Sequence, residues 1–208
     1  MNEIKPDISL AQMSFADAQC LWKNGHQDGD WPLPETRQES ESFLRLVEEY
    51  QSLALLGLGD MLAIHHQAQL CGFVVCNTIS DTWLPTDITA VECGTYLLPE
   101  HRGKGLNLPT KTALFAHVWQ AYKANWCVFI VAEHNHRAQA AMKKLPWPFS
   151  VEQSRTPAVA PALAPTAAPA TTTSDAPAVF QRYLRRKRWE LGHDFFLYKL
   201  AQSAYQPV

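Results

Sequence analysis

The chain has 208 residues, of which 47% are hydrophobic and 11% aromatic, and this composition predicts one globular domain rather than a disordered chain. Its formal net charge of −2 gives no general attraction to nucleic acid or to an anionic membrane. The N-terminal residues lack the pattern of a signal peptide, and no apolar stretch has the length of a membrane span, so we expect a cytoplasmic protein. Five scattered cysteines without a CxxC pair favour buried free thiols over disulfides or a metal site.

The hydrophobic pattern of residues 7–145 alternates between the period of helices and that of strands. Ser14 with Asp17, and Thr36 with Glu39, have the spacing of a capping box at a helix start. In chain order we expect a strand over residues 7–13, a helix over 15–23, a second helix after Thr36 that includes 43–50, strands over 61–67, 70–80 and 88–98, a helix over 108–124, a strand over 126–132 and a helix over 136–145.

Residues 156–178 differ in kind, because they consist almost entirely of Pro, Ala and Thr. The regular prolines exclude a helix and the small side chains cannot build a core, so we expect a flexible, extended insertion. Residues 180–191 and 194–200 then predict two strands joined by a tight turn. We therefore expect a C-terminal β-hairpin over residues 179–201 that completes the sheet of a single domain spanning residues 1–208.

Residues 91–107, VECGTYLLPEHRGKGLN, pass from an apolar strand through a Pro-Glu turn into a basic loop with spaced glycines, and a helical pattern follows. The free backbone N–H groups at such a junction, together with the helix dipole, favour an anion such as phosphate. Gly103 and Gly105 would let the main chain approach the anion, and Arg102 and Lys104 add positive charge. On these residues alone, the interpretations as a phosphate-binding loop and as a plain surface turn are equally supported.

Residues 99–106, PEHRGKGL, resemble the pyrophosphate-binding loop of the Gcn5-related N-acetyltransferases, the GNAT superfamily, whose pattern is Arg/Gln-x-x-Gly-x-Gly/Ala. Arg102 and Gly105 fill the first two fixed places, whereas Asn107 stands where Gly or Ala is usual. The resemblance implies a mixed α/β fold, with a mainly antiparallel central sheet flanked by helices, and acetyl-CoA as the acyl donor. It also implies that the following residues bind acetyl-CoA: Leu97, Leu98, Arg102, Gly103, Lys104, Gly105, Leu106, Asn107 and Asn135, the last at the start of a family-like Asn-x-x-Ala segment.

The acid and base that are usual in this family have no counterpart in the chain. Met142 stands at the place of the family's Tyr, Ala138 at that of an alternative Ser, and Ile130 at that of a Glu that some relatives use. A carboxylate, an imidazole or a phenol near the amine could serve instead, although each also fits a structural role. The candidates are Glu92, Tyr96, Glu133, His134 and ordered water.

The resemblance predicts an enzyme that moves the acetyl group of acetyl-CoA to a primary amine by direct attack. The acceptor could be a small molecule or a protein N-terminus. The GLNxxxK pattern of residues 105–111 resembles the GNAT branch that acetylates protein N-termini or small amines. A relative that binds acyl-CoA or a partner without catalysis is the first alternative, and a nucleic-acid-associated protein using the basic run 182–188 is the second. We expect the enzyme to bind no nucleic acid, membrane or metal ion. A homodimer is one possible oligomeric state.

Overall fold

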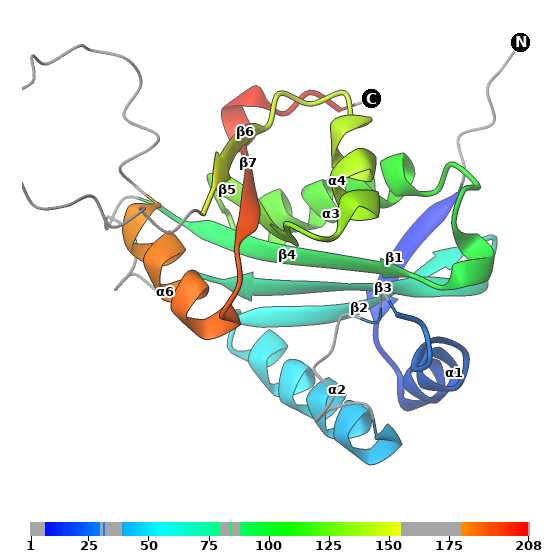
Figure 1. The fold of residues 1–208 in the computed structure, drawn as a ribbon. Helices are drawn as coiled ribbons and strands as arrows, with labels where there is room; N and C mark the ends of the chain where they lie inside the picture. The colour runs from blue at the N-terminus through cyan, green and yellow to red at the C-terminus, as the bar shows by residue number, and fades with distance from the viewer. Residues whose placement is uncertain are drawn as a thin grey trace, which may run out of the picture.

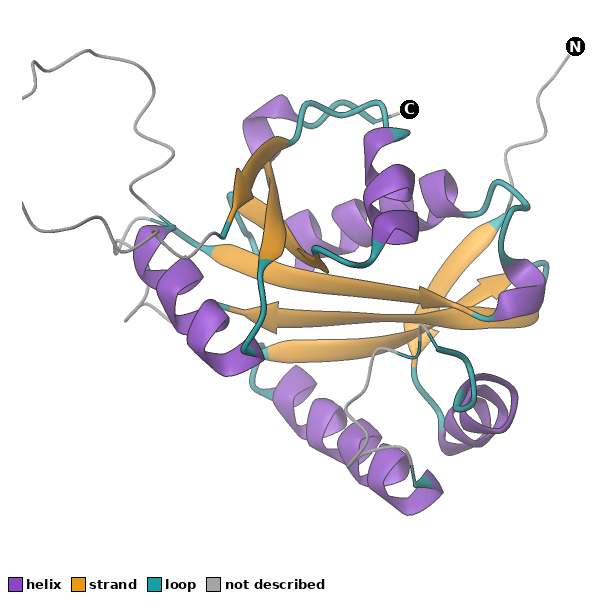
Figure 2. Ribbon diagram, viewed as in Figure 1, coloured by secondary structure: helices purple, strands orange, loops and turns teal. Residues whose placement is uncertain are grey.

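The computed structural model describes residues 7–29, 31, 39–79, 84, 88–154 and 180–207 of the chain. Its fold is a central β-sheet with helices on both faces (Figures 1 and 2). The elements, in chain order, are β1 (Ile8–Gln12), α1 (Phe15–Gly25), α2 (Ser40–Leu55), β2 (Gly59–His66), β3 (Gln69–Thr78), β4 (Ala90–Leu97), the 3₁₀ turn η2 (Pro99–His101), α3 (Asn107–Ala121), β5 (Trp126–Ala132), α4 (His136–Lys143), β6 (Ser150–Gln153), α6 (Gln181–Leu191), β7 (Phe195–Ala201) and the 3₁₀ turn η3 (Gln202–Ala204).

In the described ranges, seven strands lie in the order β1-β2-β3-β4-β5-β7-β6, and of their pairings that of β4 with β5 is parallel. The mixed, mainly antiparallel sheet confirms the predicted fold class. The β4–β5 pairing covers three positions and ends at Glu92 and Val128, although β4 continues to Leu97 and β5 to Ala132. The two strands therefore part in the middle of the sheet, and we call the region beyond Glu92 and Val128 the splay.

Each strand supplies side chains to both faces, as the period of two requires. Along β2, Met61 and Ala63 pack with α1 and α2, whereas Leu62 and Ile64 pack with α3. Figure 1 shows α1 and α2 on one face of β1–β4 and α3 and α4 on the other. Helix α6 covers β5 and β7 through a third cluster that includes Val128. Even-numbered residues of β4 and β5 thus face α2 or α6, and odd-numbered residues face α3.

The capping predictions have different outcomes. Ser14 and Asp17 form the expected capping box, in which Ser14 Oγ accepts from the Asp17 N–H at 3.1 Å and the Asp17 carboxylate accepts from the Ser14 N–H at 3.2 Å. Thr36 lies outside the described residues, and α2 begins at Ser40 after an N-cap, Glu39, whose side chain makes no capping bond. Four cysteines are buried free thiols, whereas Cys20 is exposed.

The predicted strand over residues 180–191 is wrong, because this segment is the helix α6. Its buried residues Tyr183 and Leu184 lie on the same side as the buried N-cap Phe180, and Arg182, Arg185 and Arg186 are exposed. Gly192 ends the helix with a φ of +68°. The sheet is completed instead by β7, which pairs with β5 and with β6. The predicted insertion over residues 156–178 lies outside the described residues.

In the ranges that the structure describes, no helix combines the length and the apolar character that a membrane crossing requires.

Candidate active site

The glycine loop connects the end of β4 to the start of α3. Gly103 and Gly105 have φ values of +71° and +76°, and a Cβ atom on either would meet nothing within 4 Å. These positions therefore need glycine for their backbone conformation, while the space beside them is open. Helix α3 begins at Asn107, and its N-cap, Leu106, provides no side-chain hydrogen bond. The N–H groups of Asn107 and Leu108 therefore have no side-chain cap, and together with the partial positive charge of the helix start they can attract an anion.

Asn107 is the first residue of α3 rather than its N-cap, and its Nδ2 donates to the Ala141 carbonyl at 3.4 Å.

Arg102 fixes the loop to the rest of the fold. Its Nε donates to the Leu97 carbonyl at 2.8 Å, and its guanidinium forms an ion pair with Asp28, in which Nη1 lies 3.1 Å from Oδ1. Tyr96 donates to Asp28 Oδ2 at 2.9 Å and lies under the guanidinium. Burial and the Asp28 carboxylate raise the pKa of Tyr96 well above its usual value. The side chain of Arg102 therefore positions the loop, while its main chain is part of the loop itself.

The main chain of β4 presents alternate residues to the splay. Leu98 donates its N–H to the Cys71 carbonyl of β3 at 2.8 Å, so residues of this parity pair with β3. Because N–H and C=O groups of neighbouring strand residues point to opposite sides, Thr95 and Leu97 direct theirs toward β5, which has parted from β4. The Leu97 carbonyl accepts from Arg102 Nε, so a ligand would pair with the Leu97 N–H and with the main chain of Thr95. An extended ligand with amide groups could pair with β4 there, in the place of the missing strand.

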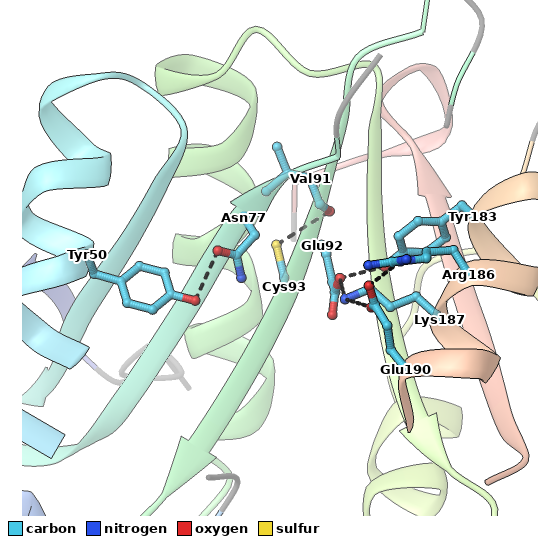
Figure 3. Close-up of polar contacts among 9 residues, drawn as sticks. All are labelled: Tyr50, Asn77, Val91, Glu92, Cys93, Tyr183, Arg186, Lys187 and Glu190. Carbon is cyan, nitrogen blue, oxygen red and sulfur yellow. Dashed lines mark hydrogen bonds and ion pairs between the residues drawn. The ribbon is translucent and has the colours of Figure 1, made fainter. Parts of the chain in front are cut away.

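Glu92 lies at the last paired position of β4 and is held by α6 (Figure 3). Its Oε2 accepts from the Tyr183 hydroxyl at 2.6 Å and lies 2.7 Å from Lys187 Nζ. Burial, followed by the charge of Glu92, raises the pKa of Tyr183 far above its usual value, so Tyr183 is a donor. Lys187 also lies 3.7 Å from Glu190. Glu92 is thus a carboxylate beside the splay, with 23% of its side chain exposed, on the face of the sheet that carries α6.

Lys111 lies on the opposite, α3 face of the same region. It is 4% exposed, its Nζ donates to Thr95 Oγ1 at 2.5 Å, and it lies 4.0 Å from the centre of the Phe129 ring. Burial lowers the pKa of Lys111 to about 8. Sequence reasoning did not select this residue, although a signal was present, because Lys111 shares a helical stripe with the buried Leu114, Phe115 and Val118.

Residues 7–146 match the family model of the acetyltransferase (GNAT) domain. The chain belongs to the GNAT acetyltransferases. No curated protein matches it.

Among solved structures, RimL, a ribosomal L7/L12 alpha-N-protein acetyltransferase in complex with coenzyme A, has a TM-score of 0.65 at 14% identity, and the match covers 98% of each chain. RimJ from Mycobacterium smegmatis, in complex with CoA-disulfide, has a TM-score of 0.63 at 10% identity, over 94% of this chain and 82% of that chain. A mutant of SpeG, a spermidine N-acetyltransferase from Vibrio cholerae, has a TM-score of 0.58 at 16% identity, over 94% of both chains. These low identities make the three structures evidence of a shared fold.

Two further predicted site residues of this GNAT protein, His134 and Asn135, lie in the connection between β5 and α4. His134 is exposed, two residues beyond the end of β5, with its ring 5.6 Å from that of His193. Asn135 caps α4, because its Oδ1 accepts from the Ala138 N–H at 2.9 Å. The structure thus brings Glu92 and Lys111 to the two faces of the splay, whereas His134 follows the end of β5 and is exposed.

Proposed function

We propose that this GNAT protein transfers the acetyl group of acetyl-CoA to a primary amine of a small molecule or a protein N-terminus. The observation that carries the proposal is the divergence of β4 from β5 directly before the glycine loop. The main chain of Thr95 and the N–H of Leu97 would pair with the amide-containing arm, and the uncapped start of α3 would receive the pyrophosphate. This arrangement would hold the thioester in the splay, beside an amine that arrives from the α6 face.

The acetyl donor supplies an activated carbonyl carbon, and the chain must supply an amine that has lost its proton. Glu92 is the carboxylate best placed to attract an ammonium group and to receive its proton, directly or through a water molecule. Tyr183 and Lys187 would hold the carboxylate in place during that step, because both contact the same oxygen, Oε2. Because Tyr183 and Lys187 already occupy Oε2, a relay through a water molecule fits the geometry.

The activities of two proteins with similar folds support a primary amine as the acceptor. RimL is described as acting on a protein α-amino group, and SpeG as acting on spermidine, and both acceptors are primary amines. The test incubates the protein with acetyl-CoA and spermidine, or with peptides that have free or acetylated N-termini, and measures the acetylated product by mass. We expect product from at least one free amine and none from the acetylated peptide.

A matched pair of variants tests the role of Glu92. Glu92→Gln removes the charge at the splay, whereas Glu48→Gln makes the same change at an exposed position of α2. We expect the first to lower kcat about 100-fold, the size of a lost general base, and the second to leave kcat unchanged. Equal kcat values in both variants would remove Glu92 from the reaction.

A binding protein without catalysis is the second candidate, because Met142, a side chain without a proton to donate, stands where the family has Tyr. Binding of acetyl-CoA without any acetylated product would favour this candidate.

A further inference from the structure

Lys111 places an ammonium group between the two parting strands. Its Nζ bonds to Thr95 of β4, three residues beyond the last β4–β5 pair, and lies over Phe129 of β5, one residue beyond that pair. Helix α3 brings the side chain there from the first turns after the glycine loop. The ammonium thus lies on the α3 face of the splay, opposite the face that carries Glu92.

Within the part of the chain that the structure describes, this ammonium has no anionic partner. Among the described residues, no carboxylate forms an ion pair with Lys111, and the ionisable groups that act on it are the thiols of Cys76, Cys93 and Cys127. A buried cation without an anionic partner is costly, and an apolar side chain would fill this helix position more favourably. Since Leu114, Phe115 and Val118 occupy the rest of the stripe, packing alone gives no reason for a lysine.

We propose that Lys111 is the general acid of the reaction and gives its proton to the departing sulfur. This inference rests on the proposed acetyl transfer. The acceptor nitrogen forms a bond to the carbonyl carbon, the carbon–sulfur bond breaks, and the sulfur takes a proton from Lys111 Nζ. The proton lost by the acceptor leaves through Glu92 or water, and solvent restores the proton on Lys111.

Three observations support this assignment. First, the family's Tyr position is Met142, which lies on α4 in the buried cluster that also contains Phe129 and Cys93. Second, Glu92 and Lys111 lie on opposite faces of the sheet, so the incoming amine and the outgoing sulfur would each meet a separate group. Third, burial lowers the pKa of Lys111 to about 8, near the value of about 8.5 for the thiol of cysteine. A proton can therefore pass between the two groups without a large energetic step.

The test compares Lys111→Met with Lys143→Met, which makes the same change at an exposed position of α4. The measurements are kcat and KM for acetyl-CoA from pH 6 to pH 9.5, together with calorimetric binding of coenzyme A. For the wild type we expect kcat to fall as the pH rises through about 8, because the acid loses its proton. Lys111→Met should lower kcat about 100-fold and abolish that fall, while coenzyme A affinity and KM stay within about threefold. Lys143→Met should match the wild type.

The possible failures are distinguishable. A wild type that acetylates no amine would overturn the acetyl transfer and this inference together. Turnover by Lys111→Met at the wild-type rate, with the same pH profile, would overturn the role of Lys111 alone. If Lys111→Met does not fold, the wild-type profile decides, because a kcat that stays constant up to pH 9.5 excludes an acid with this titration.

Discussion

Replacing Lys111 by Met should make the folded protein more stable, and this prediction can be given a magnitude. In the folded state burial lowers the pKa of Lys111 from 10.5 to about 8. At about 1.36 kcal/mol for each pKa unit, holding the charged form inside the protein costs about 3 kcal/mol. Met has a similar length and no charge, but Thr95 would lose its hydrogen-bond partner at a cost of about 1 kcal/mol. We therefore expect Lys111→Met to raise the free energy of unfolding at pH 7 by about 2 kcal/mol.

The sign of the pH dependence follows from the same shift. Because the folded pKa is below the unfolded one, the unfolded state binds more protons between about pH 8 and pH 10.5. The free energy of unfolding of the wild type should therefore gain a contribution as the pH rises through this window, and Lys111→Met should lack that contribution. Below about pH 8 both states are protonated and the full cost of the buried charge is present.

Urea unfolding followed by tryptophan fluorescence measures both effects. Lys143→Met is the control, since an exposed substitution changes stability by about 0.5 kcal/mol or less. A Lys111→Met protein that is less stable than the wild type at pH 7 would refute the reasoning, because it would show that the lysine stabilises the folded state. Greater stability together with lost turnover would instead be the pattern of a residue that serves activity at the expense of stability.

Two further substitutions test the ion pair that fixes the glycine loop and the hydrogen bonds of the buried Asp60. Asp28→Asn should weaken acetyl-CoA binding about tenfold in a calorimetric titration, because Arg102 loses the ion pair that fixes the glycine loop, and an unchanged affinity would contradict this role. Asp60→Asn should lower the free energy of unfolding at pH 7 by about 2 kcal/mol, because the hydrogen bonds from His117 and Tyr122 to Asp60 Oδ2 lose the negative charge of their acceptor. The His117 bond is the main cause of the lowered pKa of Asp60, so its stabilisation is present above about pH 4 and is lost as the pH falls through the folded pKa. A difference from the wild type that persists unchanged at pH 2 would contradict this account.

Local chemistry made the glycine loop predictable from sequence. Gly103 and Gly105 lie in a loop between β4 and α3, as expected, and α3 begins at Asn107, one residue before the predicted start. The divergence of β4 and β5 could not be predicted in this way. The divergence depends on the position at which β4 and β5 stop pairing, and these strands are distant in sequence. The residues of the two strands contain no pattern that marks this position.

The C-terminal segment shows a different limit. Residues 181–191 contain few apolar side chains among many charged ones, and the spacing of Phe180, Tyr183 and Leu184 becomes meaningful once the helix is known to cover β5 and β7. Because this helix was predicted as a strand, the partners of Glu92 could not be foreseen. Glu92 was selected from sequence as a candidate base, but its contacts with Tyr183 and Lys187 come from tertiary packing.

Calorimetric titration of acetyl-CoA tests the central claim most directly, with the wild type, Gly105→Glu and Gly57→Glu side by side. The two glycines are matched, because both have a positive φ, +76° and +67°, and open space around the Cβ position, but Gly57 lies in the connection between α2 and β2. A glutamate at position 105 would place a negative charge where the pyrophosphate is expected. We predict binding to the wild type and to Gly57→Glu, and binding at least tenfold weaker to Gly105→Glu. No binding to the folded wild type, or equal binding to all three proteins, would contradict the assignment of the glycine loop and the splay to acetyl-CoA.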